Sequence, residues 1–404
     1  MRLHVTIQRH HHSTDLITMQ YDFHTAQQRA GIGCEKYDKR RAIFGTEQVI
    51  PLWVADMDFA APAYITEALA QRAALPSYGY AERMDSWAVA VSAWLDRHHH
   101  WHVPHEWLLP TAGVVPSLAM LIQLLSERGD GVIIQPPVYF PFYGLVTENQ
   151  RELLLNPLRE VDGQYRMDLE QLSELLPRAR LLILCNPHNP GGRAWREDEL
   201  NALAKLCAAH DVMVLSDEIH MDLTYPGHHH LPFARVASTV CQYITVTSSG
   251  KTFNTAGIGG GYAIIENTAL RQALQRRQQV FHLGGEQIFS LLATETAYRL
   301  GHDWPVSLMS HIAAMRDQVI GACDGSPITP MLAEASYLLW LDCRRLEMDD
   351  NELQRFFIER AGLGLSAGSV FGEQGRGFMR INLATTPAIM TRAMQQLHMA
   401  LNSL

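Results

Sequence analysis

From about residue 105 to residue 267, short apolar runs alternate with amphipathic stretches, and few folds are compatible with this alternation. The apolar runs are expected to form buried strands, at residues 132–135, 152–156, 181–186, 212–217, 243–249 and 260–266. Stretches with helical spacing separate several of them, at residues 116–129, 168–177 and 196–211. Continuous apolar strands between amphipathic helices are typical of a largely parallel sheet that helices cover on both faces. The pattern therefore predicts an α/β fold.

The pattern changes near residue 286, where long helical stretches replace the alternation. Residues 286–303 and 307–323 have helical spacing, and strand-like runs follow at 337–342 and 377–382, before a final amphipathic helix. Helices mixed with sparse strands predict a smaller α+β domain. The expected organisation is an N-terminal extension, a large α/β domain and a small domain built from two segments, at residues 1–20, 50–285, and 21–49 with 286–404.

Charge and cysteine content argue against several classes of protein. The chain has 404 residues and a net charge of −9 without a long basic run, which disfavours a nucleic-acid or anionic-membrane surface. Its six cysteines are scattered and never spaced as CxxC, which disfavours disulfides and a zinc site. No apolar stretch approaches the length of a membrane span. We therefore expect a cytoplasmic protein that binds neither nucleic acid nor membrane.

The sequence contains 20 histidines, with triplets at residues 10–12, 98–100 and 228–230. Adjacent histidines do not share one face of a helix, and cysteine or acidic residues at ligand spacing do not accompany them. Solvated surface histidines are the simpler interpretation, so no metal site is predicted.

Polar residues gather at the positions where predicted strands end. Asn189 lies in the turn-rich segment LCNPHNPGG, and Asp217 ends the run VMVLSD. Ser248 and Lys251 lie in TVTSSGKTFN, and Gly113 opens a turn that leads directly into a predicted helix. Each residue alone is a weak signal, since a lysine flanked by serine and glycine is usually solvated. Because open parallel sheets bind ligands at the carboxyl ends of their strands, the joint occurrence of these residues indicates one site.

This set meets the chemical requirements of pyridoxal 5'-phosphate, beginning with the phosphate group. A phosphate binds well to free backbone N–H groups at the N-terminus of a helix. Gly113, Val114 and Val115 can supply such groups, and the Ser248 hydroxyl adds a further donor. The phosphate is therefore expected at the start of the helix that follows Gly113.

The ring and the aldehyde of this cofactor require further groups. A buried carboxylate keeps the pyridine nitrogen protonated, a role that suits Asp217. The side-chain amide of Asn189 can donate to the phenolic oxygen, and Tyr139, at a strand end, can cover the flat ring. Lys251 is the lysine whose amine can condense with the aldehyde. Lys251 is accordingly predicted to hold the cofactor as an internal aldimine.

Several longer segments are specific in combination: VADMDFAAP (54–62), SYGY (77–80), SDEIHMDL (216–223), SSGKTFN (248–254), ASYLLWLD (335–342) and GRGFMRIN (375–382). With these segments, residues 20–400 resemble the fold-type I pyridoxal-phosphate enzymes, the aspartate-aminotransferase superfamily. They are most similar to its cystathionine β-lyase group of carbon–sulfur lyases, which includes the maltose-regulon modulator type. The resemblance implies a mostly parallel sheet sandwiched by helices, with a smaller α+β domain.

The resemblance also implies a homodimer with a shared active site. By this likeness, Tyr80 reaches the cofactor phosphate of the neighbouring subunit. Arg380 would bind the α-carboxylate of a small amino-acid substrate, a role that suits a planar guanidinium. Because Arg380 lies within an apolar strand pattern, its burial without a partner anion would be costly.

At some positions the sequence departs from the aminotransferase pattern. His220 stands where many aminotransferases carry a tyrosine beside the cofactor, and this agrees with the lyase-like group. Gly259 replaces a basic residue that is common at the phosphate, and Gly250 replaces a common hydroxyl. The phosphate is then expected to depend on backbone groups, Ser248 and Tyr80.

The favoured reaction is an α,β-elimination on a sulfur amino acid such as L-cystathionine, which yields a thiol (homocysteine), pyruvate and ammonia. Lys251 is expected to be the base that removes the α-proton, and Tyr80 or Tyr139 to protonate or steer groups near the ring. A class I/II aminotransferase would share every cofactor contact and is the alternative enzyme. The modulator type suggests a second alternative, a regulatory protein that acts on a transcription factor through protein contacts, since the sequence has no helix-turn-helix or basic arm.

Overall fold

A computed structural model describes residues 21–283 and 287–404 of the chain. The predicted extension at residues 1–20, with the histidine triplet at 10–12, lies outside the described residues. Within the described residues, no helix is both long enough and apolar enough to span a membrane. All six cysteines lie in this part of the chain and are free thiols.

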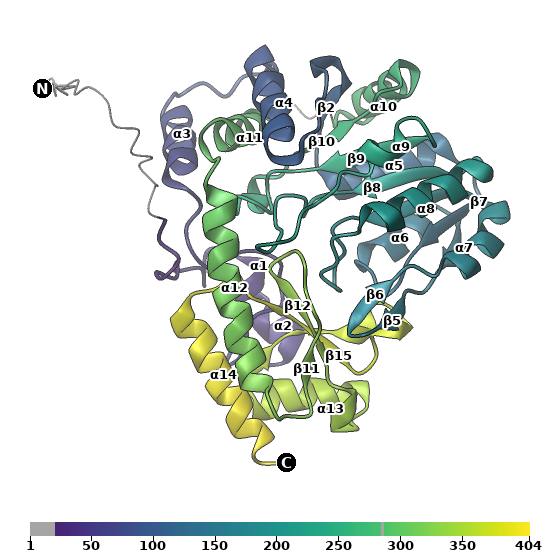
Figure 1. The fold of residues 1–404 in the computed structure, drawn as a ribbon. Helices are drawn as coiled ribbons and strands as arrows, with labels where there is room; N and C mark the ends of the chain where they lie inside the picture. The colour runs from purple at the N-terminus through teal and green to yellow at the C-terminus, as the bar shows by residue number, and fades with distance from the viewer. Residues whose placement is uncertain (1–20, 284–286) are drawn as a thin grey trace, which may run out of the picture.

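The centre of the fold is a seven-stranded sheet (Figure 1). Its strands, from one edge to the other, are β2 (Leu108–Thr111), β10 (Gly261–Ile264), β9 (Tyr243–Thr247), β8 (Met213–Asp217), β7 (Ala179–Cys185), β3 (Gly131–Ile134) and β4 (Glu152–Leu155). The strands from β9 to β4 are parallel, and β10 is antiparallel to both of its neighbours. The sheet is therefore mostly parallel, as predicted.

Helices cover both faces of this sheet (Figure 1), and successive strand residues point to opposite faces. In β3, Val132 packs in one hydrophobic cluster with Leu118, whereas Ile133 packs in another cluster with Leu203. The helices of this region are α5 (Val114–Leu125), α6 (Pro141–Thr147), α7 (Leu169–Leu175), α8 (Glu197–Ala209), α9 (Ala234–Ala237) and α10 (Thr268–Phe281). The predicted α/β fold, with a sheet sandwiched by helices, is confirmed.

The remaining elements lie beside and below this sheet in Figure 1. A four-stranded sheet has the order β11 (Thr329–Pro330), β12 (Leu338–Asp342), β15 (Phe378–Asn382) and β14 (Ser366–Ala367). Two short pairs complete the strands: β1 (Ile50–Pro51) with β13 (Leu363–Gly364), and β5 (Arg159–Val161) with β6 (Gln164–Arg166). The helices are α1 (Glu35–Asp38), α2 (Arg40–Phe44), α3 (Ala63–Ala73), α4 (Asp85–His99), α11 (Ile288–Leu300), α12 (Trp304–Cys323), α13 (Asp350–Arg355) and α14 (Pro387–Leu401). The division into a large and a small domain stays a prediction.

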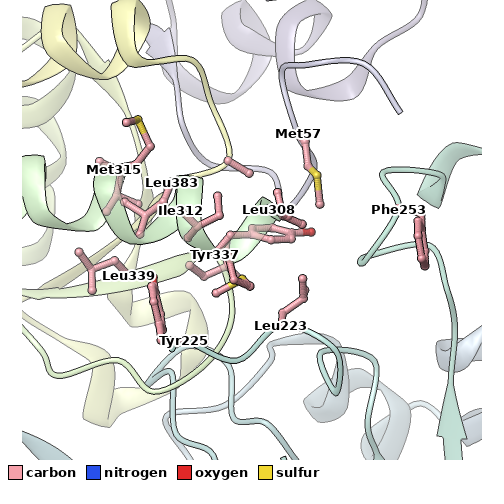
Figure 2. Close-up of a cluster of buried hydrophobic side chains, with 14 of the residues drawn as sticks. Met57, Leu223, Tyr225, Phe253, Leu308, Ile312, Met315, Tyr337, Leu339 and Leu383 are labelled. Carbon is pink, nitrogen blue, oxygen red and sulfur yellow. The ribbon is translucent and has the colours of Figure 1, made fainter. Parts of the chain in front are cut away.

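A third hydrophobic cluster joins the smaller sheet to α12 and to the segments around the large sheet. Figure 2 shows Tyr337 in the middle of it, with Leu308 and Ile312 of α12 on one side. Met57 and Leu223 approach from other segments of the chain. The ring of Tyr337 is thus held by apolar contacts from several elements.

The structure differs from the expected strands at one edge of the large sheet. Strand β2 was not expected, because it has only four residues and one of them is Pro110. Proline lacks a backbone N–H and is tolerated at a sheet edge, where β2 lies. The antiparallel direction of β10 follows from its connection to β9, which contains no crossover helix.

Candidate active site

A cavity opens at the carboxyl ends of the central strands, where the sequence placed the candidate site. Its lining consists of Ala55, Val114, Val115, Tyr139, Cys185, Asn189, Asp217, Ile219, His220 and Lys251. Strands β7 and β8 end at Cys185 and Asp217, and the loop after β9 carries Lys251. Because parallel strands end at the same edge of a sheet, residues far apart in the sequence meet here.

Lys251 is partly buried in this cavity, and its amine Nζ donates a hydrogen bond to the carbonyl of Ala55 at 2.7 Å. Burial, and next the nearby Arg380 guanidinium, lower the pKa of Lys251 to about 8. The uncharged amine, the form that can act as a nucleophile or a base, is therefore far more accessible near neutral pH than in an ordinary lysine.

Asp217 is buried at the end of β8, and its carboxylate accepts a hydrogen bond from the backbone N–H of Ile219 at 3.1 Å. Burial raises the pKa of Asp217 to about 7. Within the described residues, this carboxylate forms no ion pair within 4.0 Å. A cationic group placed in the cavity would therefore stabilise its ionised form.

Asn189 lines the cavity, and Arg380, which does not line it, is hydrogen-bonded to Asn189. Nη1 of Arg380 donates to Oδ1 of Asn189 at 3.0 Å, so the amide nitrogen of Asn189 remains the group that can donate elsewhere. Nη2 of Arg380 donates to the carbonyl of Trp53 at 2.9 Å and to Ser366 Oγ at 3.3 Å. Burial lowers the pKa of Arg380 to about 10, and its Nε is buried without a hydrogen-bond partner among the described residues. An anion beside this guanidinium could accept a hydrogen bond from this Nε.

The N-terminus of α5 lies at another side of the cavity. Gly113 is its N-cap residue, with a φ of 151°, a conformation that side-chain-bearing residues rarely adopt. Val114 and Val115 follow in the first turn, whose N–H groups have no acceptor within the helix. Ser248 is connected to this turn through Gly260. The Ser248 hydroxyl donates to the Gly260 carbonyl at 3.0 Å, and the Gly260 N–H donates to the carbonyl of Ala112, which precedes Gly113. Val114 and Val115 line the cavity, whereas Ser248 does not.

Tyr139 and His220 both line the cavity. Burial raises the pKa of the Tyr139 phenol, and the charge of Asp217 raises it further. Burial lowers the pKa of His220 to about 3, so its imidazole is neutral at physiological pH. Nδ1 of His220 lies 3.3 Å from Ser336 Oγ, which fixes the orientation of the ring.

Tyr80 is the predicted site residue that lies apart from the others. It lies between α3 and α4, its side chain is fully exposed, and it does not line the cavity. A role for Tyr80 within the same subunit is therefore not supported by this geometry, whereas a role at another subunit stays a prediction.

The structure adds groups that the sequence did not single out. The Ala55 carbonyl accepts hydrogen bonds from Lys251 and, at 3.1 Å, from the hydroxyl of Tyr337. The side-chain amide of Asn382 holds the two neighbouring carbonyls, those of Val54 and Asp56, at 2.6 Å each. In the sequence, the segments at residues 54–62 and 375–382 contribute only to the family pattern. A backbone carbonyl has no signature in the sequence, so only the structure could identify Ala55.

A family model described as aminotransferase class I and II matches residues 48–397. The chain belongs to this family. Cystathionine beta-lyase PatB from Bacillus subtilis (strain 168) is 38% identical over 386 residues, 94% of this chain and 100% of PatB. Protein MalY from Escherichia coli (strain K12) is 33% identical over 371 residues, 90% of this chain and 94% of MalY. The crystal structure of cystalysin from Treponema denticola, which contains pyridoxal 5'-phosphate, has a TM-score of 0.92 and 32% identity, with 95% of this chain and 100% of cystalysin covered.

The predicted resemblance is thereby confirmed: the chain has the fold of the fold-type I enzymes and is a pyridoxal-phosphate-dependent carbon–sulfur lyase. The cavity fits this cofactor. A protonated pyridine nitrogen would supply the cation that the buried Asp217 lacks, and the first turn of α5 would face the phosphate. The free amide nitrogen of Asn189 would donate to the phenolic oxygen. These residue roles stay predictions.

Proposed function

We propose that this lyase cleaves L-cystathionine, or a related sulfur amino acid, to a thiol (homocysteine), pyruvate and ammonia by α,β-elimination. The observation that carries the proposal is the proximity of two basic side chains, the Lys251 amine in the cavity and the Arg380 guanidinium beside Asn189. The Lys251 amine has a lowered pKa, and the Arg380 guanidinium has a buried Nε without a partner among the described residues. An amino acid brings a carboxylate for Arg380 and an α-proton for Lys251. Relatives named cystathionine beta-lyase support the choice of substrate.

In this mechanism, bound pyridoxal 5'-phosphate supplies a cationic ring that withdraws electrons from the substrate α-carbon. The neutral form of the Lys251 amine, which its lowered pKa of about 8 makes accessible, removes the α-proton. Arg380 holds the carboxylate and so fixes which substituent of the α-carbon faces Lys251. Asp217 stays ionised against the ring cation, and Tyr139 covers the cavity beside it. The β-thiolate then leaves with the electron pair of its bond to carbon.

Tyr80 extends the proposal to a homodimer. Its fully exposed side chain cannot serve its own cavity, which it does not line. We place it at the cofactor phosphate of a second copy of the chain, where its hydroxyl would add a donor to the backbone groups of α5. Each site would then need both subunits.

An aminotransferase activity is the second candidate, because the matching family model covers aminotransferases of classes I and II. Both reactions begin with removal of the α-proton by the same lysine, and they differ in whether a leaving group departs. A substrate with a good β-thiolate leaving group favours elimination.

The test is turnover of L-cystathionine by the purified, cofactor-loaded protein, with thiol and pyruvate both measured. Equal amounts of the two products support the lyase. Transfer of the substrate's amino group to the cofactor, which leaves a keto acid that retains the carbon–sulfur bond and releases no thiol, would show an aminotransferase instead. Lys251→Ala should abolish both products, whereas Lys205→Ala, at an exposed lysine of α8, should leave them unchanged. Borohydride reduction followed by peptide mapping should find the cofactor label on Lys251 and nowhere else.

A further inference from the structure

Two of the histidine triplets, 98–100 and 228–230, meet in space although His100 and His228 are 128 positions apart in the sequence. His98, His99 and His100 at the end of α4, together with His229 and His230, line one hollow. Pro305 and Val306, at the start of α12, also line the hollow. This hollow is separate from the cofactor cavity, whose lining shares none of these residues.

Two of these imidazoles are each backed by a buried carboxylate. Nε2 of His99 lies 2.7 Å from Oδ1 of Asp222, and Nε2 of His230 lies 2.8 Å from Oε2 of Glu218. The centroids of the two rings are 5.6 Å apart. A carboxylate partner holds a proton on Nε2, which leaves Nδ1 as the nitrogen available to a ligand. Nδ1 of His230 is buried without a hydrogen-bond partner among the described residues.

The acidic groups behind the histidines are already satisfied by donors of the protein. Besides His99, Asp222 accepts from Trp94 Nε1 at 2.9 Å and from Thr252 Oγ1 at 2.7 Å. Besides His230, Glu218 accepts from Ser216 Oγ at 2.7 Å and from the Phe233 N–H at 3.0 Å. These carboxylates therefore orient the imidazoles and do not need a cation in the hollow. In the described part of the chain, moreover, no group of three or more histidine, cysteine or acidic side chains is arranged to hold a metal ion.

The remaining charged and polar groups of the hollow favour an anion. Arg235 lines it with an exposed side chain, and His100 and His229 are exposed beside it. The 20-residue helix α12 begins here, and the first-turn N–H of Val306 has no acceptor within the helix. Asp222 is the only acid in the lining, and three donors hold it.

We propose that this hollow binds a small oxyanion, a phosphate or carboxylate group, between Arg235 and the carboxylate-backed imidazoles of His99 and His230. Binding takes up a proton, because an imidazole must be protonated on Nδ1 as well as Nε2 to donate to the anion. Burial lowers the pKa of His230, which favours its neutral form in the free protein. Affinity for the anion therefore rises as the pH falls. The hollow is connected to the loop that carries Lys251, because Asp222 in its lining accepts a hydrogen bond from Thr252, the residue after Lys251.

The test is calorimetric titration of the cofactor-saturated protein at constant ionic strength, with inorganic phosphate in one arm and acetate in the other. Saturation with cofactor fills the other phosphate site, and the visible absorption of the bound cofactor reports any displacement. We expect saturable phosphate binding that is about tenfold tighter near pH 6 than near pH 8. Tight binding in only one arm identifies the ligand as a phosphate or as a carboxylate.

Arg235→Gln removes a charged donor at an exposed position, so the variant should fold, and affinity should fall about tenfold with the loss of one charge-assisted hydrogen bond. Arg128→Gln removes the same charge from an exposed position outside the hollow and should leave affinity unchanged. Equal losses in both variants, binding that is independent of pH, or no saturable heat in either arm would each overturn the proposal.

Discussion

Lys251 and Asp217 lie in the same cavity. Burial lowers the pKa of Lys251 and raises the pKa of Asp217, so it favours the neutral form of each. Without the cofactor, the amine is partly deprotonated and the carboxyl is partly protonated near neutral pH. In the proposed roles, bound pyridoxal phosphate would bring a pyridinium for Asp217 and an aldehyde for Lys251.

Asp217→Asn is predicted to stabilise the cofactor-free protein in a pH-dependent way. The pKa of Asp217 is raised from 3.8 to about 7 in the folded state, so between these values the folded protein retains a proton that the unfolded chain releases. Stability contributed by the wild-type residue is therefore complete below the lower value and is lost as the pH rises through the higher one. Urea unfolding should find the variant more stable by about 2–4 kcal/mol near pH 8 and equal to the wild type near pH 4. An equal stability at both pH values would contradict the raised pKa.

Tyr337→Phe tests whether the second donor on the Ala55 carbonyl tunes Lys251. Without the Tyr337 hydroxyl, this carbonyl becomes a better acceptor for the Lys251 ammonium, so the pKa of Lys251 should rise by about half a unit. The pH dependence of acylation of Lys251 in the cofactor-free protein measures this shift. Tyr143→Phe is the matched control, since it removes a 3.0 Å bond from a tyrosine to the Phe371 carbonyl outside the cavity. Both variants should lose about 1 kcal/mol of stability, but only Tyr337→Phe should move the pH profile.

At the scale of elements, the connection between β9 and β10 links Ala112, which precedes the N-terminus of α5, to Ser248, and we propose that the cofactor phosphate binds here. The N–H of Gly260 donates to the Ala112 carbonyl at 3.2 Å, and the Gly260 carbonyl accepts from Ser248 Oγ at 3.0 Å. Gly260 has a φ of 85°, and a Cβ at this position would lie 2.9 Å from Cβ of Ser290, with Ser290 Oγ closer still. A glycine is therefore required by both conformation and space.

Gly260→Ala is accordingly predicted to lower the free energy of unfolding by about 2–4 kcal/mol and to weaken cofactor binding. Displacement of Gly260 would disturb Ala112, next to Gly113, and Ser248 at the same time. Gly257→Ala, in the same connection, is the control, because a Cβ there would meet nothing within 4 Å and its φ is not in the left-handed region. Thermal unfolding and cofactor titration measure the two effects. A Gly260→Ala protein that binds the cofactor normally would show that this connection does not support the proposed phosphate site.

Periodicity predicted the central elements well because each is decided locally. An apolar run such as residues 181–186 is buried on both sides wherever it pairs, and β7 occupies almost the same residues. The edge strand β2 was not predicted because its apolar run is too short to indicate a strand. The direction of β10 depends on packing between distant segments, which a local sequence pattern does not contain. The same division applies to the site: Asp217 and Lys251 end or follow strands and could be predicted, whereas the Ala55 carbonyl is a main-chain atom of an irregular segment.

At the scale of the molecule, one irregular segment connects distant parts of the chain around the active site. The Trp53 carbonyl accepts from Arg380 of β15, and the Ala55 carbonyl accepts from Lys251 in the loop after β9. Just before this segment, β1 pairs with β13. The group proposed for the substrate carboxylate and the group proposed for the α-proton are therefore held by the same stretch of backbone. A shift of this segment would change the distance between the two.

Because Tyr80 is exposed on the single subunit, we predict that it contributes to activity only in the assembled homodimer. A large aromatic side chain that is fully exposed on one subunit is expected to be covered by another in the proposed homodimer. Lys251→Ala and Tyr80→Ala should each be inactive as pure proteins, because each variant lacks one component of every site. When equal amounts are dissociated and reassembled together, random pairing should restore about a quarter of the wild-type activity, because half of the dimers are mixed and one site in each is complete. Activity that stays at zero after reassembly into dimers would place Tyr80 and Lys251 in the same subunit's site, and the proposal of a shared active site would then be wrong.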